Sequence, residues 1–400
     1  MHSLNVLVVG TGMYVCGRGT DGFGTIIPAI SEWVREGNEL SSLTCVGTSV
    51  AGGQLLKSKL DELRAVTGVY LKTEIFPNEG EPDPLAYRKL LSRIPRPACA
   101  IVSVPDDLHY QVIKDCLDQG LHVLVVKPFT NLASEGAELV KLAQKKGLYG
   151  AVEFHKRWDR SNILLKDLFN DGQLGDPLYS KVEYSQRKSI PAQAFRAWSM
   201  RTTILQYLGV HYVDAMRFIT GGSPKKVMAV GQKKWLVSQG VDTFDSIQAI
   251  IEWEIQPNNT FMQIILVNWI DPEGTSAMSD QKLNLVGTRG RYDSDQKERG
   301  IVLTTDSRAT EHLNPDFSRP YRNSGGKMTW KGYGIDSVRT FLNDVDNLSK
   351  GRISLLDLSG DVRPTFGEAI ISTAVIEQAH KSLYSVSEWH EIPNVWDENR

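Results

Sequence analysis

The chain has 400 residues, which is too many for one ordinary hydrophobic core and favours two domains. A hydrophobic fraction of 41%, a charged fraction of 23% and a formal net charge of −2 are typical of a globular protein and argue against nucleic acid or an anionic membrane as partners. No stretch approaches the ~20 apolar residues of a membrane span, and the chain enters a strand at once without a signal region, so we expect a cytoplasmic protein.

Residues 4–150 alternate short apolar runs with helix-like segments, which predicts an α/β domain built on a doubly wound parallel sheet. The expected strands lie at residues 4–9, 43–47, 73–76, 98–104, 122–126 and 149–154. The expected helices lie at residues 25–36, 54–66, 84–91, 108–119 and 134–145. We assign residues 1–152 to this first domain.

The first strand leads into a loop that reads GTGMYVCGRGTDGFG. A GxG directly after the first strand lets the backbone turn tightly and approach a pyrophosphate, so Gly10, Gly12 and the adjacent Met13 are candidate cofactor residues. The third glycine of the usual fingerprint is replaced by Val15. A merely flexible loop is the alternative, and the extra glycines suggest a lengthened one.

No carboxylate follows the second strand, where an enzyme that uses NAD would usually hold the ribose. Ser49, with Lys57 or Lys59 nearby, could instead bind a 2′-phosphate, which favours NADP slightly over NAD. The alternative is that Ser49 caps the next helix and that both lysines lie on the surface.

The stretch LHVLVVKPFT ends the fifth predicted strand and delivers Lys127 at its C-terminal end. Ligands of open parallel sheets collect at that edge, so the ammonium could meet a substrate. Pro128 biases Lys127 toward an extended conformation and keeps it on a turn. A solvated lysine at a strand end is the alternative.

From about residue 153, strand-like stretches follow one another without crossover helices, which predicts an antiparallel open sheet in a second α+β domain, residues 153–400. The expected strands lie at residues 179–186, 226–230, 245–254, 260–269, 282–286 and 300–304. Helices are expected at 203–219 and 333–348, and a final helix at 364–383 is expected to pack back on the body. A sheet without an obvious covering helix suggests a homodimer or homotetramer.

The cysteines are widely spaced and have no histidine at metal-ligand spacing, so we expect buried free thiols in a reducing compartment and no bound metal. They are Cys16, Cys45, Cys99 and Cys116.

Several short motifs occur together in the order and spacing of the Gfo/Idh/MocA oxidoreductases, which the chain resembles over essentially its whole length. They are GTG at 10–12, SVPDDLH at 103–109, VKP at 126–128, FHKRWD at 154–159, LGVHYVDAMRFITG at 208–221 and LVGTRG at 285–290. The resemblance implies an N-terminal Rossmann domain and a C-terminal α/β domain for substrate binding and oligomerisation. It also implies oxidation or reduction of sugars, inositols or related polyols with NAD(H) or NADP(H).

Carried over by position, the resemblance makes Lys127 the active-site lysine of an EKP motif whose glutamate is Val126 here. Pro105 and His109 would flank the cofactor, although His109 could instead be packed under its loop. Lys156 and Trp158, after the last Rossmann strand, would contact substrate.

The family's DxGxH motif reads Tyr207-Leu208-Gly209-Val210-His211 here, so a tyrosine takes the acidic position. Residues 207 and 211 share a helix face and could converge on one substrate oxygen, with Asp214 orienting His211. The alternative is that both are packed helix residues. We expect His211 or Tyr207 to be the acid/base, with Lys127 as its electrostatic partner and the tyrosine's pKa lowered by the Lys127 ammonium.

The segment SQRKSIPAQAFRAWSMR carries arginines and a tryptophan, including Arg196, Trp198 and Arg201, that could bind an acidic sugar or could form a solvated loop. The leading hypothesis is a NAD(P)-dependent dehydrogenase or reductase of a sugar or cyclic polyol. Two alternatives are a hydrolase or lyase that recycles tightly held NAD, and a regulator that binds dinucleotide without turnover. The sequence names neither the substrate nor the direction of reaction.

Overall fold

The computed structural model describes residues 3–358, 360, 362–385 and 387–394. Its first half contains a six-stranded parallel sheet with the order β3-β2-β1-β4-β5-β6. The strands are β1 (Leu4–Val9), β2 (Leu40–Val46), β3 (Thr73–Phe76), β4 (Ala98–Val102), β5 (His122–Val126) and β6 (Gly150–Glu153). This confirms the predicted α/β class with a doubly wound sheet.

Helices pack on both faces of this sheet, as its near-continuous apolar strands require. They are α1 (Met13–Cys16), α2 (Ile26–Arg35), α3 (Val50–Thr67), α4 (Arg88–Leu91), η1 (Asp106–Leu108), α5 (His109–Asp118) and α6 (Ala133–Lys146). The helix predicted at 84–91 is only one turn long, whereas α3 begins four residues before its predicted start. The four cysteines are buried free thiols, as predicted.

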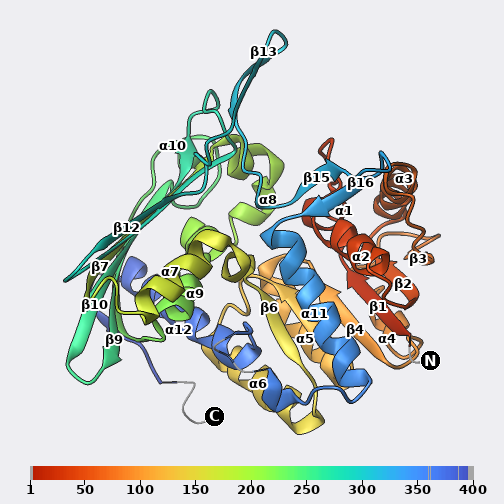
Figure 1. Cartoon of the computed structure of the whole chain (residues 1–400), viewed down its shortest axis with the longest axis horizontal. Coiled ribbons are helices and arrows are strands. Elements are labelled where there is room, and N and C mark those ends of the chain that lie inside the picture. Colours follow the sequence, from red (N-terminus) through yellow and green to blue (C-terminus); the bar gives the residue numbers. More distant parts are fainter. Residues whose placement is uncertain (1–2, 359, 361, 386, 395–400) are drawn as a thin grey trace.

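The second sheet has seven strands in the order β12-β11-β7-β10-β9-β8-β17. These strands are β7 (Pro177–Arg187), β8 (Ser223–Gln232), β9 (Ser246–Gln256), β10 (Asn259–Asp271), β11 (Ser279–Gly287), β12 (Arg291–Asp295) and β17 (His390–Glu391). The sheet is mixed rather than purely antiparallel, because the chain leaves β7 and returns through two other strands before β10 pairs with it in parallel. Figure 1 shows the helices α7, α9 and α12 on one side of this sheet only.

The remaining strands form two separate ribbons. They are β13 (Val302–Thr305) with β14 (Arg308–His312), and β15 (Arg319–Arg322) with β16 (Met328–Lys331). The strand predicted at 300–304 therefore belongs to a ribbon that projects from the body and not to the large sheet (Figure 1).

The helical segments of the second half come in two groups. The first group is η2 (His155–Trp158), α7 (Arg160–Asn170), a π-helix (Ile190–Ala194), α8 (Arg196–Ser199), a second π-helix (Leu205–Gly209), α9 (Val210–Thr220) and α10 (Trp235–Ser238). The second group is α11 (Tyr333–Ser349), η5 (Leu355–Asp357) and α12 (Phe366–Tyr384).

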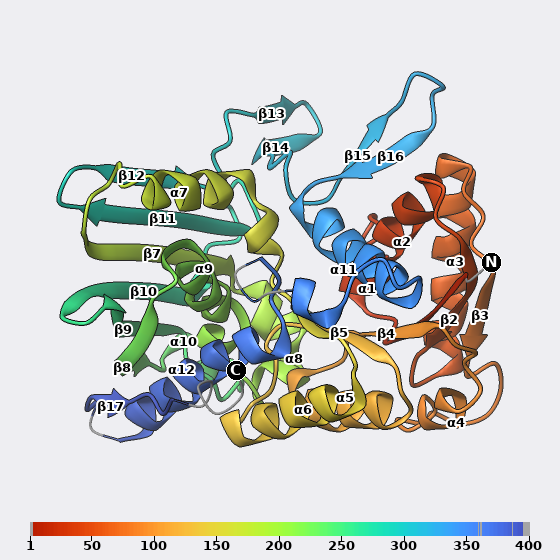
Figure 2. The ribbon, with the colours of Figure 1, turned by 60° about the horizontal axis from the view of Figure 1, so that its bottom comes forward.

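Helix α11 returns to the first sheet and covers one of its faces (Figure 2). Its side chains Ile335, Val338 and Leu342 are fully buried in the cluster that holds Val6 and Ile101 of the parallel strands. The core of the first half is therefore completed by a segment that is almost two hundred residues distant in sequence. No helix within the described ranges is long and apolar enough to cross a bilayer.

Candidate functional site

Lys127 follows β5 at the C-terminal edge of the parallel sheet, where the predicted turn places it. Its Nζ donates a hydrogen bond to the carbonyl of Tyr207 and lies 3.5 Å from the centroid of the Tyr207 ring. Burial lowers the pKa of Lys127 to about 7, even though the carboxylates of Asp106 and Glu153 act in the opposite direction. A lysine in this state exchanges protons near neutral pH.

His211 lies on α9 beside this lysine. It is 3% exposed, and its Nδ1 is buried without a hydrogen-bond partner among the residues that the structure describes. Burial, together with the nearby His155, Lys127 and Lys156, holds the pKa of His211 well below its usual value. The imidazole is therefore neutral at neutral pH.

Tyr207 sits on the π-helix that precedes α9, so the segment is not the regular α-helix that was predicted. The expected lowering of its pKa is wrong: burial and the charge of Asp106 raise the pKa of Tyr207 to about 12. The physical reason is that burial of the phenol disfavours its charged form, while Nζ of Lys127 lies over the face of the ring in a cation–π contact. Tyr207 therefore stays protonated near neutral pH, and its hydroxyl can donate a hydrogen bond.

Asp214 does not orient His211. It makes a bidentate ion pair with Arg157, with Arg157 Nη2 2.7 Å from Asp214 Oδ1 and Nε 2.9 Å from Oδ2, and both side chains are 1% exposed. The guanidinium of Arg157 binds the carboxylate of Asp214 because its planar N–H groups can donate to both oxygens at once. Arg157 also donates to the carbonyl of Gly360, so this pair is structural and joins α9 to η2.

Lys156 and Trp158, which were predicted to contact substrate, are held by the protein. Lys156 is 2% exposed and donates to Gln281 at 2.6 Å and to Gln296, and burial lowers its pKa to about 7. The indole of Trp158 donates to Thr340 of α11 at 3.0 Å. Both side chains point into packed parts of the molecule, where they donate hydrogen bonds to polar partners.

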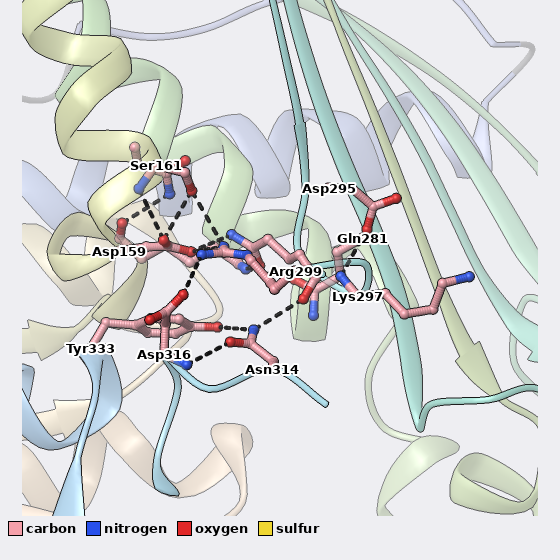
Figure 3. A network of polar contacts seen from close by, with 12 residues as sticks. Asp159, Ser161, Gln281, Asp295, Lys297, Arg299, Asn314, Asp316 and Tyr333 are labelled. Carbon is pink, nitrogen blue, oxygen red and sulfur yellow. Dashed lines mark hydrogen bonds and ion pairs between the residues drawn. The ribbon is translucent and has the colours of Figure 1, made fainter. Parts of the chain in front are cut away.

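The segment 295–316 supports this region through a polar network. Figure 3 shows Arg299 between Asp159 and Asp316, and Asn314 beside Tyr333. Arg299 donates to the carboxylate of Asp159 at 2.8 Å and to that of Asp316 at 2.9 Å. Asp159 also accepts from Gln296, the residue that binds Lys156. The network ties α7, the end of β12 and α11 together.

The basic segment before the π-helix at 205–209 is neither a free substrate clamp nor a solvated loop. The indole of Trp198 donates to Asp106 at 2.7 Å, and Thr202 and Gln206 donate to the same carboxylate at 2.8 and 2.6 Å. Arg201 pairs with Asp107. Residues 188–209 therefore form a strap, which is bonded to the loop after β4.

His109 begins α5 and is fully buried. Its Nδ1 lies 2.7 Å from the carbonyl of Pro128, and its Nε2 lies 3.0 Å from the carbonyl of Val104. Both nitrogens are occupied, so the prediction that His109 flanks a cofactor gives way to the packed alternative. It fixes the turn that carries Lys127, while Pro105 on the same loop remains exposed.

The glycine loop fits a closely approaching dinucleotide. Gly10 has φ +119°, and a Cβ there would lie 2.1 Å from the carbonyl oxygen of Ser103, so only glycine fits between the first and fourth strands. A Cβ at Gly12 would meet open space, which leaves its backbone accessible. Met13 begins the short helix α1, half-buried beside this space.

Ser49 caps α3, because its side chain accepts a hydrogen bond from the backbone N–H of Gly52 at 3.2 Å. The two lysines named from the sequence face elsewhere: Lys57 lines a hollow between α3 and β3, and Lys59 donates to the carbonyl of Thr20. The nearby cation is Arg18, whose Nη1 is 3.7 Å from the position of a Cβ at Gly52.

The sequence reasoning missed a buried polar group beside Lys127. Glu153 ends β6 and is paired in register with Val126 of β5, and it accepts from Nδ1 of His155 at 2.9 Å. The hydroxyl of Tyr14 lies 3.4 Å from the same nitrogen, and the His155 ring is 4.5 Å from that of His211, centroid to centroid. The signal available was the FH pair inside FHKRWD, preceded by a carboxylate at a strand end. Among the residues described, no three His, Cys, Asp or Glu side chains form a metal site.

Two family models match the chain. The model described as "Oxidoreductase family, NAD-binding Rossmann fold" matches residues 61–154, and "GFO/IDH/MocA C-terminal domain" matches residues 163–293. The two matches cover the parallel strands β3 to β6, α9 and most of the large sheet, whereas β1, β2 and the glycine loop lie outside both.

Curated relatives match shorter stretches. The scyllo-inositol 2-dehydrogenase (NADP(+)) IolW of Bacillus subtilis is 34% identical over 130 residues, which are 32% of this chain and 36% of that protein. An uncharacterized oxidoreductase of Schizosaccharomyces pombe is 24% identical over 273 residues, or 66% of this chain and 68% of that protein. A trans-1,2-dihydrobenzene-1,2-diol dehydrogenase of Macaca fascicularis is 26% identical over 198 residues, or 48% and 57%. The chain thus spans about a third to two thirds of the lengths of these relatives.

A solved structure of similar fold is an inositol dehydrogenase homolog from Azotobacter vinelandii complexed with NADH and myo-inositol. It has a TM-score of 0.72 and 15% identity, and the match covers 98% of both chains. At 15% identity the two proteins can be said to share a fold.

Proposed function

Because the chain belongs to the Gfo/Idh/MocA oxidoreductase family, we propose that it transfers a hydride between NAD(P) and a secondary alcohol or ketone of a sugar, sugar derivative or cyclic polyol. The observation that carries the proposal is the pair formed by Lys127 and His211 at the C-terminal edge of the Rossmann sheet. An amine with a pKa of about 7 lies there beside a neutral imidazole whose Nδ1 lacks a partner within the described part of the chain. The polyol names of the relatives support the substrate class.

The residues fit a dinucleotide. The backbone of Gly10 and Gly12 would hold the pyrophosphate where the missing side chains leave room, with Met13 beside it and Pro105 on the loop opposite. The bound nicotinamide accepts or donates the hydride, and the protein orients and polarises the substrate.

Lys127 and His211 would bracket the oxygen of the reacting carbon. In the oxidative direction the neutral amine of Lys127 would take the hydroxyl proton, directly or through Nδ1 of His211, which has no hydrogen-bond partner among the described residues. In the reductive direction the ammonium returns it and stabilises the developing alkoxide. Tyr207, with its pKa of about 12, remains a hydrogen-bond donor that orients the same oxygen.

We propose that the adenosine end of the dinucleotide lies against the segment after β2 and that the protein prefers NADP over NAD. The segment Val46-Gly47-Thr48-Ser49 offers no carboxylate for a ribose diol, while the exposed Arg18 lies beside Ser49 and Gly52. A guanidinium binds a phosphate through paired hydrogen bonds. The Bacillus subtilis relative is named as an NADP(+) enzyme, which agrees with this preference.

Titration of the purified protein with NAD, NADH, NADP and NADPH, followed by fluorescence, tests the cofactor assignment. We expect NADPH to bind more tightly than NADH, and Arg18→Ala to weaken NADPH about tenfold or more while NADH is unaffected, because one charged contact is lost. Lys57→Ala is the matched control, since Lys57 faces the hollow behind α3. Absence of binding by all four dinucleotides would overturn the proposed function.

We further propose that the open face of the large sheet joins copies of the chain. Ile250, Ile264 and Leu266 on this face are partly exposed, and Tyr179 and Ile270 are 44% and 39% exposed. Analytical ultracentrifugation at micromolar concentration is expected to give a dimer or tetramer. Monomer alone would contradict this assignment.

A further inference from the structure

The two carboxylates that the family motifs lead one to expect near the active-site lysine are absent, since positions 126 and 207 hold Val126 and Tyr207. Position 153 supplies a carboxylate near this lysine instead. Glu153 is the register partner of Val126 on the adjacent strand, so its carboxylate leaves the same edge of the sheet one strand away. It is 2% exposed, and its charge acts on Lys127.

Glu153 contacts His155, and the hydroxyl of Tyr14 bonds the same carboxylate. Its two carboxylate oxygens lie 2.9 and 3.2 Å from Nδ1 of His155. A carboxylate in this position holds the proton on Nδ1, so Nε2 of the neutral ring is the proton-accepting nitrogen.

The titratable groups around His155 come from several elements. Glu153 on β6, Tyr14 on α1, Tyr333 on α11 and His211 on α9 all face the ring. Phe317 closes the remaining side at 5.2 Å, centroid to centroid. His211, in turn, is influenced by Lys127 and Lys156. Within this cluster Glu153 is the acid, and both of its oxygens face the histidine next to the proposed reaction centre.

We propose that Glu153 and His155 form a positioning dyad, in which the buried carboxylate stands in for the two missing acids and stabilises positive charge when a proton enters the site. The proposal rests on the proposed function. During oxidation of the alcohol the hydroxyl proton passes to Lys127 or His211 as the hydride leaves the carbon. The dyad offsets the resulting charge without contacting substrate.

Glu153→Gln tests the dyad because it removes the charge but keeps the shape. We expect kcat to fall roughly 10- to 100-fold with KM little changed, as for other supporting carboxylates. The acid limb of the pH profile for oxidation should move to lower pH, since Lys127 loses a carboxylate that raises its pKa. Glu153→Asp, which keeps the charge, should restore the profile.

Imidazole NMR of the cofactor-free protein, with labelled histidine, supplies a readout that needs no turnover. His155 is expected to carry its proton on Nδ1 in the wild type, and to lose that preference in Glu153→Gln. If Glu153→Gln fails to fold, His155→Gln gives a second test. We expect it to lower kcat as well, and its pH profile can be compared with that of the wild type. The matched control is Glu32→Gln, because Glu32 is also buried but bonds the backbone of Trp330 away from the site.

A His155 tautomer and a pH profile that are both unchanged in Glu153→Gln would overturn the dyad, whatever the activity. Failure of the proposed function itself would appear differently, as a wild-type protein that turns over no polyol while the NMR result still reports on Glu153 and His155.

Discussion

Lys127 is the residue on which the chemistry depends, and its environment gives the expected pH dependence. Oxidation of an alcohol needs the neutral amine, so the oxidation rate should rise as the pH increases through about 7. Lys127→Met should lower turnover by a factor of about 10² to 10⁴ while dinucleotide affinity changes little. Lys145→Met, an exposed lysine on α6, is the control. A flat pH profile, or an active Lys127→Met variant, would count against this role.

Lys156 should affect stability rather than substrate binding. Its folded-state pKa of about 7 lies below the value of about 10.4 for an unfolded lysine. Between these values the unfolded chain binds more protons, so the free energy of unfolding should increase as the pH rises from about 7 toward about 10. Urea unfolding at several pH values should show a smaller increase for Lys156→Met. A raised KM with an unchanged pH slope would favour substrate contact instead.

At the level of single residues, the sequence predicted positions that lie near one another better than the contacts that each side chain makes. Lys127 and His211 came from motif spacing, and the structure places them side by side. Asp214 pairs with Arg157, which is 57 residues away, and His109 bonds the carbonyl of Pro128, which is 19 residues away. Such long-range contacts depend on packing that no local pattern records.

Among the elements, the strap at 188–209 is expected to order the site through Asp106. Asp106→Asn replaces one acceptor oxygen by an amide donor that faces Trp198 at one position or Thr202 and Gln206 at the other, so hydrogen–deuterium exchange in the strap should become faster. Stability should fall by about 1–3 kcal/mol. Asp107→Asn is a close control, because its ion pair with Arg201 is at the surface. Equal effects of the two variants would argue against a special role for Asp106.

Elements of the parallel sheet were predictable because strands buried on both faces give continuous apolar runs, as at β4 and β5. Two features were not. The parallel pairing of β7 with β10 depends on the path of the chain between them, and the π-helix at Leu205–Gly209 depends on contacts of its side chains. The proximity of Glu153 to Lys127 follows from strand register, which the sequence does not specify.

For the whole molecule, the two halves are joined by α11, so the predicted boundary at residue 152 can be tested directly. A fragment of residues 1–152 would expose the sheet face that Ile335, Val338 and Leu342 cover. We expect this fragment to aggregate or to bind a hydrophobic dye, whereas linking residues 333–349 to it should reduce both. Circular dichroism and light scattering would report the outcome. Cooperative unfolding of a monomeric 1–152 fragment would contradict the expectation.

The measurement that tests the central proposal most directly is nicotinamide absorbance during incubation of the wild type and Lys127→Met with NADP or NAD and a panel of sugars and cyclic polyols. We predict cofactor reduction with at least one polyol, increasing in rate as the pH rises through about 7, and its loss in Lys127→Met. Dinucleotide binding without an absorbance change for any polyol, or equal rates in the two proteins, would contradict the proposal.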